Sequence, residues 1–285
     1  MRRGLKATDR RETAISQIKK AIASALKRDG VVILPPQDVK TTLALARLLN
    51  YQFDTVMLDP WYNKGFGGTQ DNYLSFFLSV IQESSLVADH VYFWGFPEIV
   101  APFVERIPKP LELVCWLTWY YKNNPSVIRG WRSSQNACLH MARPGATMHP
   151  ERFLNEKQLA LKEKGKLRYM PGPTSVIDGE LEAPTSVIEQ PLLVGFVGRK
   201  EQTGHPSQKP VKVYNQLLQM TVSPKGLILD PMCGSGTSGV VAKDYEFRAI
   251  LCDHSDEYTC LAEKRLNIQR LPVQKEIEML LREGA

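Results

Sequence analysis

Apolar residues along this chain form short continuous runs, separated by stretches in which apolar positions recur with helical spacing. The runs predict buried strands at 31–34, 55–58, 91–94, 111–119, 227–230 and 248–252. The stretches between them predict helices at 13–26, 38–49, 72–88, 98–106, 156–166, 211–221 and 256–269. Continuous apolar strands that alternate with helices are typical of a parallel sheet covered on both faces. The pattern therefore predicts an α/β fold with a Rossmann-like, doubly wound, mostly parallel sheet.

This rhythm is interrupted from residue 122 to residue 204, where proline, glycine and short charged segments dominate. We interpret that stretch as an insertion at one edge of the sheet. The first ten residues are predicted to be a disordered basic arm, and the C-terminal tail to be helical and peripheral. The predicted regions are 1–29 (arm and first helix), 30–121 (first half of the sheet domain), 122–204 (insertion), 205–270 (second half) and 271–285 (tail).

The strand at 227–230 ends in Asp230 and is followed by Gly234, Gly236 and Gly239, spaced as G-x-G-x-x-G. Such glycines allow a tight turn and a close approach of backbone to a ligand, beside the free N–H groups of a helix start. Asp253 follows the next strand, where a carboxylate can accept both hydroxyls of a ribose. The spacing therefore predicts a nucleotide-like site.

Glycine spacing of this kind also occurs in nicotinamide dehydrogenases, and two features disfavour that alternative. Only one strand and its helix follow the turn, which is too little for the second half of a dinucleotide domain. Asp230 would also repel a pyrophosphate, whereas it suits a ligand that carries a cation or an amine.

A second strand ends in Asp-Pro, in the segment Asp59-Pro60-Trp61-Tyr62. Ligands of parallel sheets bind outside the carboxyl ends of the strands, so Asp59 and Asp230 are expected to face one crevice. A planar base can stack on an aromatic ring while its exocyclic amine donates to a carboxylate and to a backbone carbonyl.

The charge of the chain indicates a polyanionic partner. The 285 residues carry a formal charge of +6, and basic residues outnumber acidic ones in 1–30 and in 122–204. No apolar run approaches the roughly 20 residues of a membrane span, and no secretion signal is seen, so we expect a cytoplasmic protein. The five scattered cysteines predict reduced thiols, and Cys138, His140 and His149 lack a fourth ligand, so no metal is predicted.

Three motifs resemble those of one family: Asp59-Pro60-Trp61-Tyr62, His205-Pro206-Ser207-Gln208-Lys209-Pro210 and Asp230-Pro231-Met232-Cys233-Gly234-Ser235-Gly236-Thr237. They resemble the catalytic and cofactor motifs of S-adenosylmethionine-dependent amino-methyltransferases that act on DNA. Their order is similar to the beta-type, permuted group, which includes many restriction–modification enzymes. The resemblance implies S-adenosylmethionine as cofactor and duplex DNA as partner. The initial Asp resembles adenine-N6 enzymes; cytosine-N4, an RNA or protein amine, and a homodimer stay open.

The resemblance also implies a role for each matching residue. Asp59 and the Pro60 carbonyl would hold the target amine, and Tyr62 would stack on the flipped-out base. Asp230 would hold the ammonium group of the cofactor, and Asp253 its ribose hydroxyls. The implied cofactor-binding residues are His205, Lys209, Pro210, Asp230, Pro231, Gly234, Ser235, Gly236, Thr237 and Asp253.

Trp61 stands where the family usually has proline. It is expected either to form a wall for the base or to crowd the pocket, and crowding would leave a DNA- or cofactor-binding protein without catalysis. The glycine-rich loop around Phe66 is interpreted as a mobile cover for the base or as a plain turn. The insertion 122–204 would recognise the target, with candidate phosphate or guanine contacts at Arg129, Arg132, Arg143 and Arg199.

Overall fold

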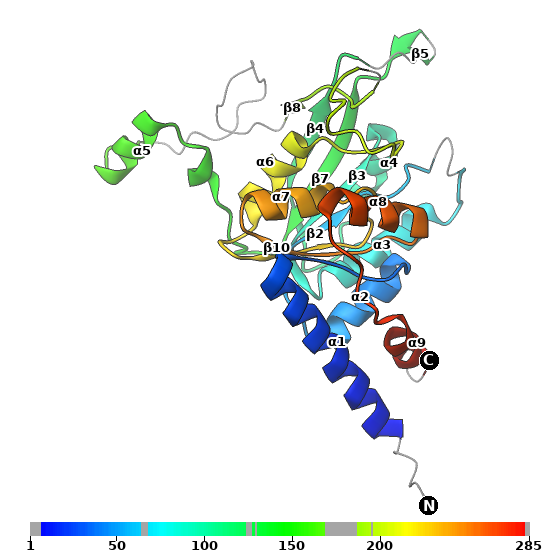
Figure 1. Ribbon diagram of the computed structural model, residues 1–285. Helices are drawn as coiled ribbons and strands as arrows, with labels where there is room; N and C mark the ends of the chain where they lie inside the picture. The colour runs from blue at the N-terminus through cyan, green and yellow to red at the C-terminus, as the bar shows by residue number, and fades with distance from the viewer. Residues whose placement is uncertain are drawn as a thin grey trace, which may run out of the picture.

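The computed structural model describes residues 7–63, 68–123, 127–128, 130–168, 187–194 and 196–282. Within them one large sheet forms the centre of the molecule (Figure 1). Its strands, in spatial order, are β1 (Val31–Ile33), β10 (Arg248–Leu251), β9 (Leu227–Asp230), β2 (Phe53–Leu58), β3 (Ala88–Gly95), β7 (Gln135–Ala142), β4 (Glu112–Tyr120) and β8 (Val187–Glu189). Strand β7 runs antiparallel to both neighbours, and the other neighbouring pairs are parallel. The predicted mostly parallel α/β fold is confirmed.

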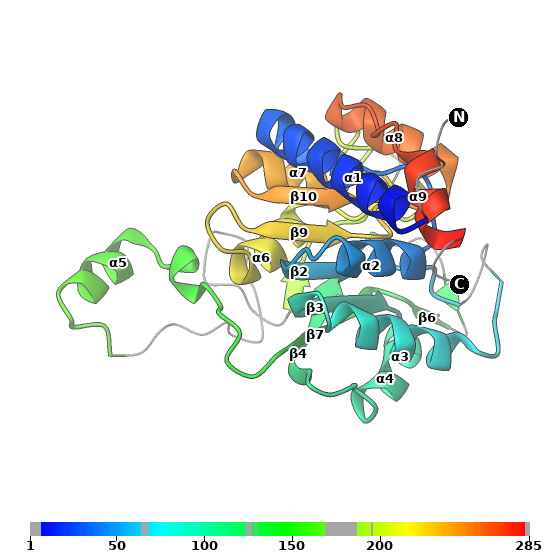
Figure 2. The ribbon, with the colours of Figure 1, turned by 90° about the horizontal axis from the view of Figure 1, so that it is seen from below.

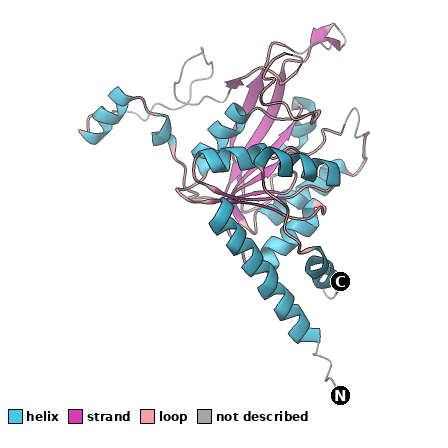
Figure 3. Cartoon of the chain, in the orientation of Figure 1, coloured by secondary structure: helices cyan, strands magenta, loops and turns pink. Residues whose placement is uncertain are grey.

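Helices cover both faces of this sheet, as Figures 2 and 3 show. The helices of one core are α1 (Ala7–Asp29), α2 (Val39–Leu48), α3 (Tyr73–Ser84), α4 (Pro97–Val104) and α9 (Gln274–Arg282), and those of the other are α6 (Val211–Thr221), α7 (Thr237–Asp244) and α8 (Asp256–Leu266). Successive strand residues alternate between the cores: Val56 and Leu58 pack in the first, and Met57 in the second. This two-sided burial explains why the strands read as continuous apolar runs.

Strand β7 corrects the predicted boundary of the insertion. It lies inside the stretch 122–204, yet it occupies the sheet between β3 and β4 rather than an edge. Its sequence, from Gln135 to Ala142, mixes amides, alanine, cysteine and histidine and has no β-branched residue, so it carries little strand signal. The strand forms because its side chains are buried between two partners, which is a tertiary effect.

Other parts of the stretch do lie outside the central fold. Helix α5 (Glu156–Glu163), with the 3-10 turn at Pro150–Phe153, extends away from the body (Figure 1) and begins in a capping box between Asn155 and Gln158. None of its residues is buried. The short strands β5 (Val127–Ile128) and β6 (Trp131–Arg132) form a separate two-stranded sheet.

Both ends of the chain depart from the prediction. Helix α1 already begins at Ala7, so residues 7–10 are helical rather than a disordered arm; residues 1–6 lie outside the described residues. Helix α9 is not peripheral, because Ile277 and Leu280 are 1% and 3% exposed and join the core beside α1. In the part of the chain that the structure describes, no helix has the length and apolarity to cross a bilayer.

Burial of α9 gives a stability prediction. Truncating the fully buried Ile277 to alanine is expected to lower the free energy of unfolding by about 2–5 kcal/mol, because it leaves a cavity between α9 and α1. Lys275→Ala, at an exposed position of the same helix, is the control and should change it by less than about 0.5 kcal/mol. Urea denaturation followed by circular dichroism measures both, and equal stabilities of the two variants would contradict the core role of α9.

Candidate active site

The ends of the two Asp-Pro strands lie side by side. Strands β2 and β9 are parallel neighbours, with Val56 opposite Leu229, so Asp59 and Asp230 follow at the same edge. Strand β10, on the other side of β9, brings Asp253 to that edge as well. The predicted convergence of Asp59 and Asp230 at one end of the sheet is confirmed.

Asp59 is held by three donors. Lys209 Nζ lies 2.7 Å from Oδ1 and 2.6 Å from Oδ2, the Tyr62 hydroxyl donates to Oδ1 at 3.1 Å, and the Tyr214 hydroxyl to Oδ2 at 3.4 Å. The Lys209 side chain is 3% exposed and that of Asp59 14%. Burial is the main reason that the pKa of Tyr62 and that of Tyr214 are raised well above the usual range, so both remain donors.

Sequence reasoning assigned Lys209 to the cofactor alone and did not single out Tyr214. In the structure the Lys209 ammonium donates to Asp59 instead. Tyr214 occupies an apolar position of α6 and packs in the core. Its place in the helical pattern therefore indicated a packing role alone.

Trp61 and Tyr62 point to opposite faces of the sheet. Trp61 packs edge-on against Tyr73 and Phe77 in the core beneath α3, and its carbonyl accepts from the Tyr73 hydroxyl at 3.0 Å. Tyr62 packs against Phe96 and belongs to the other core. Trp61 therefore lies away from the space between Tyr62 and Asp59, and nothing in its packing indicates a crowded slot there.

The glycine turn has the geometry that its spacing predicts. Gly234 and Gly236 adopt φ of +50° and +77°, and α7 starts after Gly236 without a side-chain cap, so its first N–H groups have no capping side chain. A Cβ on Gly239 would lie 2.7 Å from Leu251 Cδ1 and 2.8 Å from Leu266 Cδ1. The third glycine thus permits close packing of helix on sheet.

Asp230 and Asp253 hold this turn from below. Asp230 is 1% exposed and accepts from the Ser238 hydroxyl and, at 3.3 Å, from the Met232 N–H. Asp253 accepts from the Gly234 N–H at 2.9 Å and from the Ser255 N–H at 3.0 Å. Burial raises the pKa of Asp230 from 3.8 to about 7, against the hydrogen bond from Ser238, which lowers it.

This raised pKa predicts a pH-dependent stability. Between about pH 4 and pH 7 the folded state keeps the Asp230 proton while the unfolded state loses it, so the free energy of unfolding falls as pH rises. Asp230→Asn should remove up to about 1.4 kcal/mol of that fall per pH unit. Denaturation at pH 5, 6, 7 and 8 measures it, with the exposed Asp89→Asn as control. Parallel curves for wild type and Asp230→Asn would contradict the assignment.

The segment from His205 to Pro210 lies against the turn. A Cβ on Gly234 would sit 2.9 Å from His205 Nε2, and the His205 ring packs edge-on against Tyr258. The Thr237 hydroxyl donates to the Lys209 carbonyl at 3.0 Å, and Pro210 is the N-cap residue of α6. Burial lowers the pKa of His205, so its imidazole is neutral near pH 7.

Arg265 of α8 connects the same parts, and sequence reasoning gave it no role. Its guanidinium donates to the Ser235 hydroxyl at 3.1 Å and to the Thr237 hydroxyl at 2.9 Å, and lies 3.4 Å from Glu201. Glu201 in turn accepts from the Val211 N–H at 2.7 Å. Arg265 thus fixes the glycine turn relative to α6.

The structure describes the side chains of two of the four candidate arginines, Arg143 and Arg199. Arg143 lies at the opposite edge: its N–H donates to Asp89 at the start of β3, and its guanidinium to the Ser85 carbonyl. Arg199 is exposed, with its guanidinium 4.8 Å from the Phe196 ring centroid. Arg132 belongs to β6, but its side chain, like Arg129 and the loop around Phe66, lies outside the described residues.

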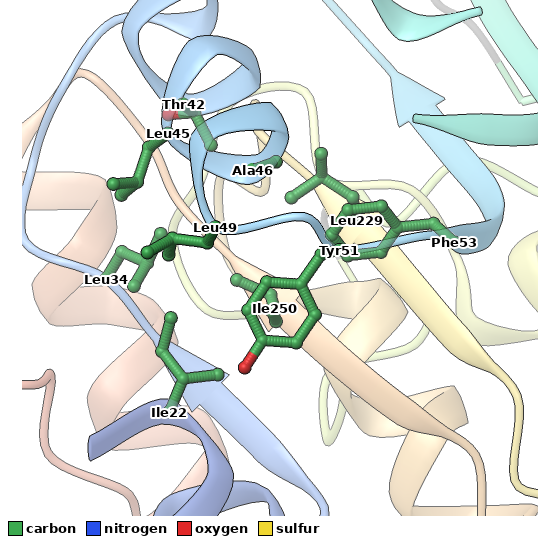
Figure 4. A pocket seen from close by; sticks show the side chains of 10 residues that line it. All are labelled: Ile22, Leu34, Thr42, Leu45, Ala46, Leu49, Tyr51, Phe53, Leu229 and Ile250. Carbon is green, nitrogen blue, oxygen red and sulfur yellow. The ribbon is translucent and has the colours of Figure 1, made fainter. Parts of the chain in front are cut away.

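One pocket lies away from the end of the sheet that carries Asp59 and Asp230. Figure 4 shows a pocket between α1, α2 and the sheet, lined by apolar side chains apart from Thr42 and the Tyr51 hydroxyl; none of its residues is a predicted site residue. Among the described residues no three His, Cys, Asp or Glu side chains are grouped to hold a metal ion.

Residues 53–264 match the model of the N6/N4 methylase family, described as DNA methylase. Type II methyltransferase M.HpaI of Haemophilus parainfluenzae is 26% identical over 239 residues, which cover 79% of this chain and 71% of that protein. Type II methyltransferase M2.LlaDCHI of Lactococcus lactis subsp. cremoris is 43% identical over 63 residues, 22% of this chain and 23% of that one.

Solved structures share the fold. The M1.HpyAVI–SAM complex aligns with a TM-score of 0.59 at 18% identity, covering 84% of this chain and 100% of that one. The cytosine-N4-specific PvuII DNA methyltransferase aligns with a TM-score of 0.56 at 14% identity, covering 89% and 94%. S-adenosylmethionine is the methyl donor of the family that residues 53–264 match, and it is the cofactor here. With its two Asp-Pro strand ends side by side and its glycine turn beside them, the chain belongs to the N6/N4 family of DNA methylases.

Proposed function

We propose that this DNA methylase transfers a methyl group to the N6 amine of an adenine flipped out of duplex DNA, in the cleft between Asp59 and the glycine turn. The observation that carries the proposal is the pairing of β2 with β9, which sets the catalytic and cofactor motifs next to each other. A paired base cannot reach such an edge, so the target leaves the helix at a cost of a few kcal/mol.

The residues around the glycine turn fit S-adenosylmethionine. Gly234 and Gly236 let the turn pack closely against His205 and against α8, and the start of α7 offers free N–H groups to a ligand. Asp230 and Asp253 place carboxyl groups beneath the turn, and a ligand with an ammonium and a sulfonium group would favour the ionised form of Asp230, whose pKa burial raises to about 7. Asp253 would accept the ribose hydroxyls, and His205 and Pro210 would cover the ligand. The bound cofactor supplies an already activated methyl group.

On the base side the chain supplies acceptors and alignment. Asp59 and the Pro60 carbonyl would accept the two protons of the amine, which localises the nitrogen lone pair toward the methyl group. Tyr62 would stack on the base, a contact worth about 1–3 kcal/mol. When the nitrogen–carbon bond forms and the sulfur–carbon bond breaks, the nitrogen must lose one proton, and Asp59 is the acceptor already placed on it. In-line transfer then depends mainly on alignment and exclusion of water.

Adenine is preferred to cytosine here because the motif begins with Asp59, as in the adenine-N6 enzymes that it resembles. Cytosine-N4 transfer is the second candidate, since the family accepts both amines. The test is incubation with tritium-labelled S-adenosylmethionine and unmethylated plasmid DNA, followed by nucleoside analysis. N6-methyladenine is the expected product, N4-methylcytosine would select the second candidate, and no labelled nucleoside would refute both.

DNA contacts are proposed on the basic surfaces. Arg199, exposed beside Phe196, is a candidate for a phosphate or base contact, and Arg129 and Arg132 remain candidates within the insertion. Arg10 and Arg11 lie near the start of α1, where they would follow the phosphate backbone. Arg143 is not proposed as a DNA contact, because its guanidinium is engaged by Ser85 at the far edge of the sheet.

A further inference from the structure

The hydrogen-bond capacity of Asp59 is fully used within the protein. An ionised carboxylate offers about four lone-pair positions. Lys209 reaches both oxygens, Tyr62 donates to Oδ1, and Tyr214 donates to Oδ2. A target amine that is to donate to Asp59 therefore finds no free position. One of these donors has to leave before the base can be held.

The same ammonium also covers the proposed stacking surface. Lys209 Nζ lies 5.1 Å from the centroid of the Tyr62 ring, within the range of a cation–π contact. A nitrogen that donates to Asp59 while resting against Tyr62 has the two contacts proposed for the target amine. The Lys209 side chain thus occupies the place of the substrate.

Lys209 is the donor that can move. Its backbone is fixed, because the Thr237 hydroxyl donates to its carbonyl and Pro210 follows it at the start of α6. Its side chain has four flexible carbons, whereas Tyr62 and Tyr214 are held by ring contacts with Phe96 and Trp94. Trp94 and Trp119 lie 5.3 and 6.0 Å from Nζ, so the ammonium can withdraw from Tyr62 and remain against aromatic rings.

We propose that Lys209 is a placeholder for the target amine: it occupies Asp59 in the free enzyme and withdraws toward Trp94 and Trp119, freeing Oδ1, when the flipped base enters. This inference rests on the proposed function, since it takes Asp59 as the acceptor of the target amine. It makes Lys209 a positioning residue that keeps the slot filled until a base competes for it. Entry of the base is then an exchange of one nitrogen donor for another.

Two substitutions at this position are expected to act in opposite directions. Lys209→Met keeps the length but removes the ammonium, so one acceptor position on each oxygen of Asp59 becomes free and the KM for DNA should fall by about tenfold, the effect of losing one charged hydrogen bond. Lys209→Arg places a planar fork on both carboxylate oxygens, which is harder to withdraw, so the KM should rise by a similar factor. In both variants kcat would change less than KM does.

The assay is initial-rate transfer from tritium-labelled S-adenosylmethionine to unmethylated plasmid DNA at fixed salt, with cofactor affinity measured by equilibrium dialysis as a check on folding. A KM that rises in both variants would show that Lys209 contacts DNA, and unchanged KM values would show that it does not compete with the base; either result overturns the inference. If Lys209→Met does not fold, Lys209→Gln, which covers one oxygen only, should still give a lower KM than Lys209→Arg.

Asp59→Asn separates this inference from the proposed function. If that variant stays fully active, Asp59 is not the acceptor of the target amine, and the placeholder role fails with it although DNA is still methylated; the proposed function itself fails only if the wild-type protein yields no labelled nucleoside. If Asp59→Asn is inactive but the KM for DNA does not increase in the order Lys209→Met, wild type, Lys209→Arg, only the placeholder role fails.

Discussion

Replacing Asp59 by asparagine is expected to lower the rate of methyl transfer by at least 10²- to 10³-fold, the size of effect seen when one essential polar group of an active site is removed. Asparagine keeps the shape of the side chain but removes the charge and replaces one acceptor oxygen by a donor. The target amine would lose its acceptor, and the ammonium of Lys209 would be left buried without its carboxylate. Single-turnover transfer from labelled S-adenosylmethionine to plasmid DNA measures the loss.

Two controls make this result specific. Cofactor affinity should stay within about twofold, because the carboxylates beneath the glycine turn are those of Asp230 and Asp253. Asp89→Asn makes the same chemical change at the exposed start of β3, at the other edge of the sheet, and should leave the rate unaltered. More than a tenth of the wild-type rate in Asp59→Asn would rule Asp59 out as the acceptor.

The second large effect is expected from Gly236→Ala. Its φ of +77° is strained for a residue with a Cβ, and the new atom would lie 3.2 Å from Ala262 Cβ and from Leu266 Cδ1 of α8. Relief requires a shift of the turn against α8, which would move the first N–H groups of α7 away from the cofactor. We expect a loss of about 1–3 kcal/mol of stability and a cofactor affinity at least about tenfold weaker.

Gly145→Ala is the matched control for this prediction. Gly145 has φ of +78°, and a Cβ there would meet nothing within 4 Å. Gly145→Ala therefore has the same strain of a positive φ as Gly236→Ala. It has neither the contact with α8 nor a position near the glycine turn. Equilibrium dialysis with labelled S-adenosylmethionine and thermal denaturation compare the two, and equal cofactor affinities would contradict the role of Gly236.

Much of this protein was determined by the sequence alone. The strands are buried on both faces, so their residues form continuous apolar runs, and the order of strands and helices follows from local patterns. The glycine turn was predictable for the same reason, since its conformation at Gly234 and Gly236 is a local property of residues without a Cβ. The meeting of Asp59 with Asp230 followed from the general rule that ligands bind at the carboxyl ends of parallel strands.

Only the tertiary structure decided the rest, because it depends on partners that are distant in the chain. Strand β7 has a weak local preference and forms between β3 and β4, which bury it. Trp61 and Tyr62 are neighbours in sequence, yet the packing of α3 draws one ring into one core while the other faces Asp59. Lys209 lies 150 positions after Asp59, and no spacing rule predicts that its ammonium donates to the Asp59 carboxylate. That carboxylate is the group proposed to accept the target amine.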